Sequence, residues 1–205
     1  MSYAAFLIQA VLISLSGVIA PGPLTVVVVG KGSRSPYSGA MIAVGHAVVE
    51  FPLMILILVG LGPVLEHVTA AAVIGLAGGL VLLWMAYGLL RSLRAGAEEE
   101  RYRSTSPLVA GILMSAANPY FLVWWATVGA TLVFRAWEYG VWQFILFGVI
   151  HWSMDVIWYF FLSSASYRGT KLLGDRFLIG IRLLCGALLL FFGVRFILDA
   201  APTLL

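Results

Sequence analysis

The sequence predicts an all-α integral membrane protein with six transmembrane helices, arranged as two inverted three-helix repeats, with the first and fourth helices broken at proline. Three observations support this fold class. The 205 residues are 62% hydrophobic and only 10% charged, against roughly 25% charged in a typical soluble domain. Six apolar blocks are long enough to cross a bilayer. A histidine followed four residues later by a carboxylate occurs once in each half of the chain.

The six apolar blocks are residues 4–29, 39–61, 69–90, 108–133, 141–163 and 177–198. Each bilayer crossing needs about 20 mostly apolar residues, so six crossings use most of the chain and leave only short connections. Residues 2–20 lack the basic start of a secretory signal, so we expect them to form a retained first helix. We therefore expect one transmembrane domain over residues 1–205, with repeat halves of about 1–95 and 104–205.

The basic residues are distributed unevenly between the loops. The odd-numbered loops hold nine of the twelve lysines and arginines, and the even-numbered loops hold one. By the positive-inside rule, the odd-numbered loops face the cytoplasm and both termini lie outside. We therefore expect a multi-pass protein of the cell (inner) membrane. The net charge of only +3 does not suggest binding to nucleic acid.

Two proline motifs interrupt apolar blocks. Pro21-Gly22-Pro23 lies in the first block and Asn118-Pro119 lies in the fourth. Proline lacks an amide hydrogen and its ring collides with a carbonyl one turn back, so a regular helix breaks there. Broken backbone inside a membrane is tolerated where protein or a water-filled cavity satisfies its polar groups. The motifs therefore indicate a cavity, although plain structural kinks are the alternative.

The second block contains His46 and Glu50, and the fifth contains His151 and Asp155. Residues four apart share one helix face. An ionised carboxylate deep in the bilayer costs about 2.5–3.5 kcal/mol on insertion scales, so it normally faces a partner or water. Burial disfavours the charged form of both residue types, so these pairs could exchange protons near physiological pH. The alternative is a hydrogen bond within each pair that only locks helices together.

A broken helix followed by a histidine–carboxylate helix thus occurs in both halves. Three helices in each half is an odd number, which inverts the second half relative to the first. Inverted repeats of this kind are typical of secondary transporters, which bind their substrates between the repeats near the middle of the membrane.

Other classes of function are less well supported by the sequence. Two histidine–carboxylate faces could supply four ligands to zinc or manganese, and their spacing alone leaves that alternative open. The metalloprotease motif is absent, as are a nucleophile motif, a cofactor motif and a nucleotide-hydrolysis motif. We therefore expect no cofactor and no enzymatic activity. A membrane scaffold would not need two buried acids.

The motifs together resemble those of the LysE/RhtB family of amino-acid exporters over the full length of the chain. The resemblance rests on Pro21-Gly22-Pro23 after an apolar helix, on residues 39–50 and on Asn118-Pro119. Two positions depart from the family pattern, with Glu50 in place of a common aspartate and Tyr120 in place of a common lysine. The resemblance implies an exporter of lysine, homoserine, threonine or a related small solute that is driven by the proton-motive force. It also implies a homodimer.

We therefore expect a secondary transporter that exports a small amino acid or related metabolite by proton antiport, with a divalent metal cation exporter as the alternative. Its partners would be the small solute, protons and the lipid bilayer. Glu50 and Asp155 would carry the protons. The candidate substrate-binding residues are Pro21, Gly22, Pro23, His46, Glu50, Asn118, Pro119, His151 and Asp155.

Overall fold

All the regular structure that can be described in this chain is helical. The computed structural model describes residues 2–20, 22–61, 68–91 and 105–204. The α-helices are α1 (Tyr3–Val18), α2 (Pro23–Gly32), α3 (Ser38–Leu56), α5 (Val68–Arg91), α7 (Pro107–Ala116), α8 (Pro119–Trp124), α9 (Ala130–Glu138) and α10 (Val141–Leu204), and two π-helical segments are η1 (Ile57–Leu61) and η2 (Trp125–Gly129). The predicted all-α class is confirmed for these ranges.

Several of these helices are suited to crossing a membrane. Ser38–Gly60, Val141–Gly174 and Leu183–Leu204 are each long and apolar enough to do so. Counting each of two bent helix pairs as one span raises the number to five, and α5 contributes a shorter apolar helix, Ala72–Gly88. The described residues therefore fit a helical membrane protein, while the six-helix inverted repeat stays a prediction.

The outer surface of the bundle carries large apolar side chains. Val59, Trp142 and Leu172 expose 74%, 76% and 83% of their surface. Soluble monomers rarely expose wide apolar patches, because water does not solvate them well. Lipid tails do solvate such side chains, so this surface matches a bilayer.

The bundle has two bent helix pairs, at the positions where the sequence predicted breaks. The axes of α1 and α2 differ by 74°, and those of α7 and the stretch Pro119–Glu138 differ by 60°. Pro23 and Pro119 each occupy a first helical position, where the missing amide hydrogen leaves no helical bond unmade. Breaks at these two prolines are confirmed, and Pro21 lies outside the described residues.

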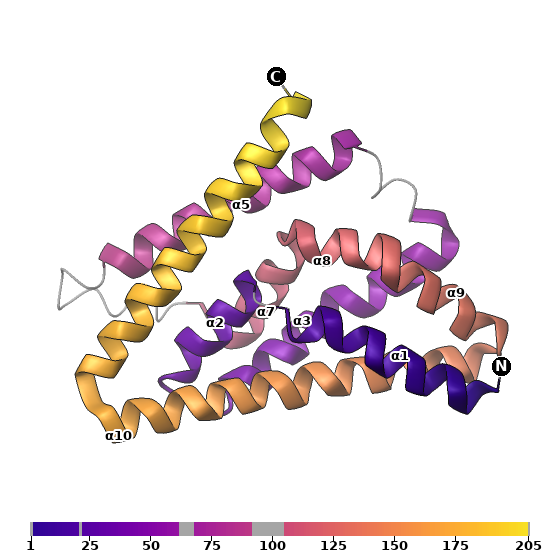
Figure 1. Ribbon diagram of the computed structural model, residues 1–205, viewed down its shortest axis with the longest axis horizontal. Coiled ribbons are helices and arrows are strands. Elements are labelled where there is room, and N and C mark those ends of the chain that lie inside the picture. Colours follow the sequence, from indigo (N-terminus) through magenta and orange to yellow (C-terminus); the bar gives the residue numbers. More distant parts are fainter. Residues whose placement is uncertain (1, 21, 62–67, 92–104, 205) are drawn as a thin grey trace.

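The fifth and sixth apolar blocks form a single element, α10, interrupted only at Gly174. Figure 1 shows α10 as two long arms that meet at a corner. Gly174 has φ 67° and ψ −154°, a conformation that glycine adopts without a Cβ clash. The loop expected between residues 163 and 177 is therefore helical up to Gly174, and the chain turns at that glycine, inside the expected range.

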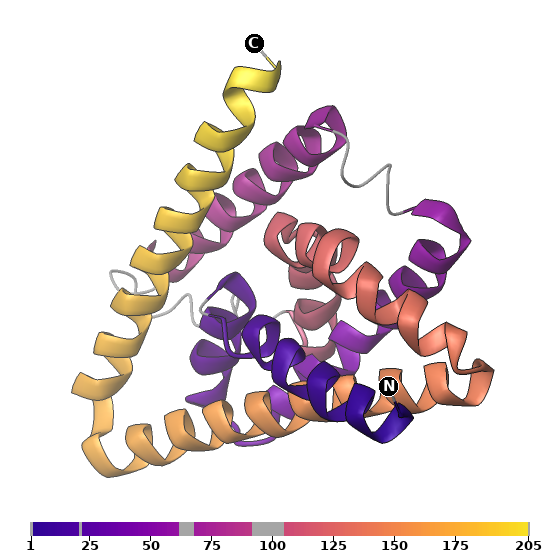
Figure 2. The same cartoon turned by 45° about the vertical axis from the view of Figure 1, so that its right-hand side comes forward.

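Close helix crossings determine how the two halves meet. A Cβ atom added at Gly45 on α3 would meet the carbonyl oxygen of Leu108 on α7, and one added at Gly111 would meet the carbonyl oxygen of Ile42. At Gly39 an added Cβ would meet the carbonyl oxygen of Tyr159 on α10. Helix α3 therefore packs backbone against backbone on two helices of the other half. Figure 2 shows the C-terminal arm of α10 beside α5, as does Figure 1.

Candidate functional site

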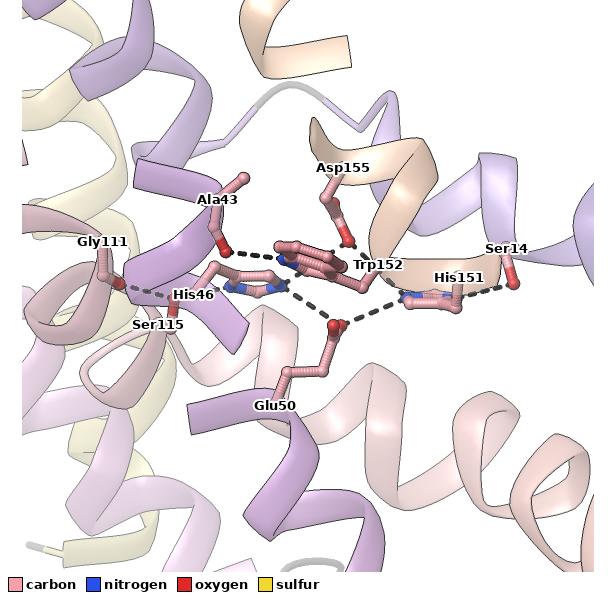
Figure 3. A network of polar contacts seen from close by, with 9 residues as sticks. All are labelled: Ser14, Ala43, His46, Glu50, Gly111, Ser115, His151, Trp152 and Asp155. Atoms are coloured by element: carbon pink, nitrogen blue, oxygen red, sulfur yellow. Dashed lines mark hydrogen bonds and ion pairs between the residues drawn. The ribbon is translucent and has the colours of Figure 1, made fainter. Parts of the chain in front are cut away.

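Two histidines and two acids converge between α3 and α10, and Figure 3 shows their side chains pointing toward one another. Nε2 of His46 and Nε2 of His151 each lie 3.2 Å from the same oxygen, Oε1 of Glu50. Oδ2 of Asp155 lies 4.0 Å from Nε2 of His46 and 3.9 Å from Nε2 of His151. We call these four residues the histidine–carboxylate centre. It brings together pairs that the sequence places about 100 residues apart.

The centre is almost completely removed from solvent. Glu50 exposes 0% of its surface and Asp155 exposes 2%. Oε1 of Glu50 has both imidazoles within hydrogen-bonding distance, whereas Oε2 of Glu50 and Oδ2 of Asp155 have no hydrogen-bond partner among the described residues. A buried polar atom without a partner is costly, and a buried charge more so. The centre therefore calls for a proton, a cation or a donor group of a ligand.

A serine from the opposite half orients each histidine of the centre. Nδ1 of His46 lies 2.6 Å from Oγ of Ser115 on α7, and Nδ1 of His151 lies 2.8 Å from Oγ of Ser14 on α1. The Ser115 hydroxyl donates its single proton to the carbonyl oxygen of Gly111, 2.7 Å away. Its oxygen must therefore accept a hydrogen bond from the N–H at Nδ1 of His46. This arrangement directs Nε2 of His46 toward the carboxyl groups.

A cavity of about 50 Å³ opens beside the centre. Since a water needs roughly 10–15 Å³, the space holds only a few water-sized groups. Both helix breaks border the cavity, through Gly22, Leu24 and Thr25 at the start of α2 and through Asn118 at the start of α8. Aromatic rings form much of the remaining wall, from Tyr120, Phe121, Trp124, Trp125 and Tyr159.

The two helix starts that border the cavity differ in their capping. Oδ1 of Asn118 accepts hydrogen bonds from the backbone N–H groups of Tyr120 and Phe121, at 3.1 and 3.4 Å, so Asn118 caps the start of α8. Gly22 gives α2 no side-chain cap. The amide hydrogens of Leu24 and Thr25 point out of the first turn of α2 without helical acceptors. This helix start therefore presents partial positive charge to the cavity.

Most of the predicted binding residues lie around this cavity. Six of the nine line it, namely Gly22, His46, Glu50, Asn118, His151 and Asp155. Pro23 and Pro119 do not line it and instead begin α2 and α8. Pro21 lies outside the described residues. The arrangement brings the six together, and their role in substrate binding stays a prediction.

Sequence reasoning missed three side chains at this site. Ser14 and Ser115 lie upstream of the two breaks, one in each half, and their matching positions were the available signal. Tyr159 lies one turn beyond Asp155, and its side chain is within hydrogen-bonding reach of that carboxyl group. Extending the four-residue spacing of His151 and Asp155 by one more turn would have found it.

Comparison with known proteins gives one match. The model of the family described as LysE type translocator matches residues 15–200. The matched range contains both helix breaks and the whole histidine–carboxylate centre. Neither the curated proteins nor the solved structures include a significant match.

Proposed function

The chain belongs to the LysE type translocator family, and from this premise we propose that it is a secondary transporter that exports a small amino acid or related metabolite from the cytoplasm by proton antiport. Family members are transporters rather than enzymes. The observation that carries the proposal is the pair of buried carboxyl groups of Glu50 and Asp155, which have free oxygens and border a cavity between two broken helices. Intramembrane acids of this kind mark substrate and ion pathways.

The walls of the cavity suit the two charges of an amino acid. The substrate ammonium would lie against the carboxyl oxygens of Glu50 and Asp155. The substrate carboxylate would lie against the uncapped start of α2, where the amide hydrogens of Leu24 and Thr25 are available. Broken helices in secondary transporters direct their N-terminal ends at anionic substrate groups in this way. The present cavity is small, so we expect it to widen when a solute enters.

The arrangement of the imidazoles supports proton coupling at the same centre. Because Nδ1 of His46 donates to Ser115, its Nε2 is the nitrogen that gains or loses a proton. That Nε2 faces Oε1 of Glu50, which also faces Nε2 of His151. A proton that enters can therefore pass between an imidazole and a carboxyl group without crossing hydrocarbon. Export would follow when substrate and protons occupy the centre alternately.

Contacts between distant segments support the proposed orientation. Nζ of Lys31 at the end of α2 donates to the carbonyl oxygen of Thr105, just before α7, at 2.7 Å. Oγ of Ser163 on α10 donates to the carbonyl oxygen of Pro36, just before α3, at 2.6 Å. These contacts place the first connection next to Thr105, just before α7, and next to Ser163 on the first arm of α10. We propose that this side is cytoplasmic, because the predicted odd-numbered loops carry nine of the twelve lysines and arginines.

Efflux from proteoliposomes tests the proposal. Vesicles that contain the purified chain are loaded with radiolabelled amino acids, and efflux is followed with and without an imposed pH gradient. We expect at least one amino acid to leave faster under the gradient. We also expect a Glu50→Gln, Asp155→Asn double variant to lose this acceleration, whereas Glu138→Gln, an exposed carboxylate on α9, retains it. Gradient-dependent efflux in the double variant would remove the proton-carrier assignment. No efflux of any amino acid would contradict the substrate class.

Export of a divalent metal cation is the second candidate function, and one observation favours it. Ligand atoms of His46, Glu50 and Asp155 lie within 4.8 Å of one another. The same vesicles, loaded with a divalent cation and a metal-sensitive dye, distinguish the two candidates, because only a metal exporter empties them of the ion. Retention of the metal together with amino-acid efflux would exclude this second candidate.

A further inference from the structure

We infer that residues 164–176, which we call the α10 corner, form a binding site for an anionic phospholipid. The headgroup lies among the basic side chains of Arg168, Lys171 and Arg176, and the acyl chains lie against Leu172 and Leu173. The inference goes beyond the proposed export of an amino acid, because it concerns the lipid-facing surface and not the histidine–carboxylate centre.

The first arm of α10 is too long to lie wholly in hydrocarbon. Val141–Gly174 has 34 residues, which at 1.5 Å per residue is about 51 Å. The hydrocarbon layer is about 30 Å thick, and transmembrane helices tilt by up to about 40°. At that tilt the arm still covers about 39 Å of depth, so about 9 Å or more of it lies at the level of the headgroups. The apolar block 141–163 is about 34 Å long and fills the hydrocarbon by itself, which places the excess at the α10 corner.

One side of the helix at the α10 corner lies against the protein and the other side faces outward. The hydroxyl groups of Ser163 and Ser166 donate to backbone carbonyls of the first connection and of α2, at 2.6 and 2.8 Å. Arg168 and Leu172 are four residues apart and share the opposite side of the helix, where both are exposed. Figures 1 and 2 both show the α10 corner at an edge of the molecule. The outward side is therefore open to lipid.

Two leucines at the α10 corner are exposed to a degree that water would not favour. Leu172 exposes 83% of its surface, the largest value of any large apolar side chain in the described ranges, and Leu173 exposes 64%. The Cα–Cβ bonds of a helix tilt toward its N-terminus, which in this arm is the direction of the bilayer. Both side chains can therefore reach acyl chains while their backbone lies at the level of the headgroups.

The α10 corner also carries an excess of positive charge. Its sequence has three basic residues and one acid, Asp175. Within the described ranges, no ion pair joins Arg168, Lys171 or Arg176 to another residue. Nζ of Lys171 lies 4.6 Å from the centroid of the Tyr167 ring, and tyrosine rings are common anchors at the membrane interface. Anionic lipids are concentrated in the cytoplasmic leaflet, which is the side proposed above for this part of the chain.

The combination of cations and exposed leucines selects the class of ligand. Free phosphate would pair with the arginines but leave Leu172 and Leu173 in water. An apolar partner would cover the leucines but leave the cations without a counter-charge. A zwitterionic lipid brings an ammonium group of its own, which lowers the net attraction to Arg168 and Lys171. An anionic phospholipid supplies both the negative charge and the apolar chains that this surface requires.

Native mass spectrometry of the purified, detergent-solubilised chain tests the inference, because it counts the lipids that stay bound. The chain is titrated with phosphatidylglycerol and, separately, with phosphatidylcholine that has the same acyl chains. We expect phosphatidylglycerol to bind more tightly, by about tenfold or more. Arg168→Gln and Lys171→Gln should each weaken its binding about fivefold, which corresponds to about 1 kcal/mol for each basic residue near an anionic surface, and should leave the binding of phosphatidylcholine unchanged. Arg135→Gln removes an exposed arginine on α9 and should bind as the wild type does.

A spin label at position 172 supplies a second readout that leaves every charge in place. The label is attached to Leu172→Cys in a Cys185→Ala background, since Cys185 is the only cysteine of the chain, and the protein is reconstituted in vesicles of the same two lipids. We expect the label to collide more often with dissolved oxygen, which concentrates in acyl chains, than with a water-soluble nickel complex.

Four results would each overturn the inference. They are equal affinity for the two lipids, displacement of phosphatidylglycerol by inorganic phosphate at equal concentration, unchanged affinity in folded Arg168→Gln and Lys171→Gln, and more frequent collision of the label with the nickel complex. Binding is measured in detergent without a gradient or a solute, so its outcome is independent of the outcome of the efflux experiment.

Discussion

Substituting Gly45 by alanine tests whether the close crossing of α3 and α7 positions His46. The new Cβ would meet the carbonyl oxygen of Leu108 at a separation that real contacts do not show, and it would lie 2.9 Å from the Leu108 carbonyl carbon and 3.1 Å from the backbone nitrogen of Ile112. All three are backbone atoms, so no side-chain rotation relieves the clash. The helices must therefore separate by about 1 Å, and overpacking of this kind destabilises by about 1–3 kcal/mol.

The same separation reaches the site. The distance from Nδ1 of His46 to Oγ of Ser115 is 2.6 Å, and adding about 1 Å takes it beyond hydrogen-bonding range. The loss of this hydrogen bond lowers the free energy of unfolding by about a further 0.5–1.5 kcal/mol. We therefore expect Gly45→Ala to lower the unfolding temperature in detergent, followed by tryptophan fluorescence, and to slow gradient-dependent amino-acid efflux. Gly88→Ala is the matched control, because among the described residues no atom outside its own helix backbone lies within 4 Å of its added Cβ. It should be neutral or stabilise by up to about 1 kcal/mol. Equal stability and equal efflux in the two variants would refute this explanation of the crossing.

Three further predictions concern side chains around the cavity. Ser14→Ala and Ser115→Ala should each destabilise by about 1–3 kcal/mol, because each leaves Nδ1 of a buried imidazole without its hydrogen-bond partner; thermal unfolding checks this, and an effect confined to one serine would contradict the equivalent roles assigned to them. Trp125→Ala should destabilise the protein by about 3–5 kcal/mol, because the ring is 1% exposed. Trp142 is 76% exposed, so Trp142→Ala should change the stability by no more than about 0.5 kcal/mol. Similar melting temperatures for the two variants would count against the assigned burial. Asn118→Ala should lose about 0.5–2 kcal/mol of stability through the missing helix cap, and Asn118→Ser should recover most of it. If both variants raise the KM for efflux although Ser restores stability, the carboxamide group that both lack contacts the solute; if Ser does not restore stability, capping does not explain the effect.

The features that could be predicted from the sequence are those set by local chemistry. The breaks at Pro23 and Pro119 follow from the missing amide hydrogen and the rigid ring of proline. The shared face of His46 and Glu50 follows from the helical period alone. The hydropathy pattern likewise predicted apolar helices, and the described residues contain three that are long and apolar enough to cross a membrane, or five if each bent pair is counted as one span.

The meeting of the two histidine–carboxylate pairs could not be predicted with equal security, because it depends on tertiary packing. It requires α3 to approach α10 closely at Gly39, where an added Cβ would meet the Tyr159 carbonyl. The contact between Ser14 and His151 joins residues 137 positions apart, and no periodicity encodes it. The helical character of residues 164–173 was not predicted for another reason. These residues are more polar than the apolar block before them, and a hydropathy pattern does not record that lysine and arginine are also good helix formers.

The crossed contacts between serines and histidines have a thermodynamic consequence. Ser14 belongs to α1 yet holds an imidazole of the second half, and Ser115 belongs to α7 yet holds an imidazole of the first. A proton or cation that binds Nε2 strengthens the hydrogen bond at Nδ1 of the same ring. It therefore stabilises the contact of the histidine with α1 or α7, although it touches neither helix. Linkage makes this effect reciprocal. A movement of α1 or α7 away from its histidine must lower the affinity of Nε2 for the proton or cation by the same factor. The imidazole rings of His46 and His151 thus couple occupancy of the histidine–carboxylate centre to the positions of α7 and α1.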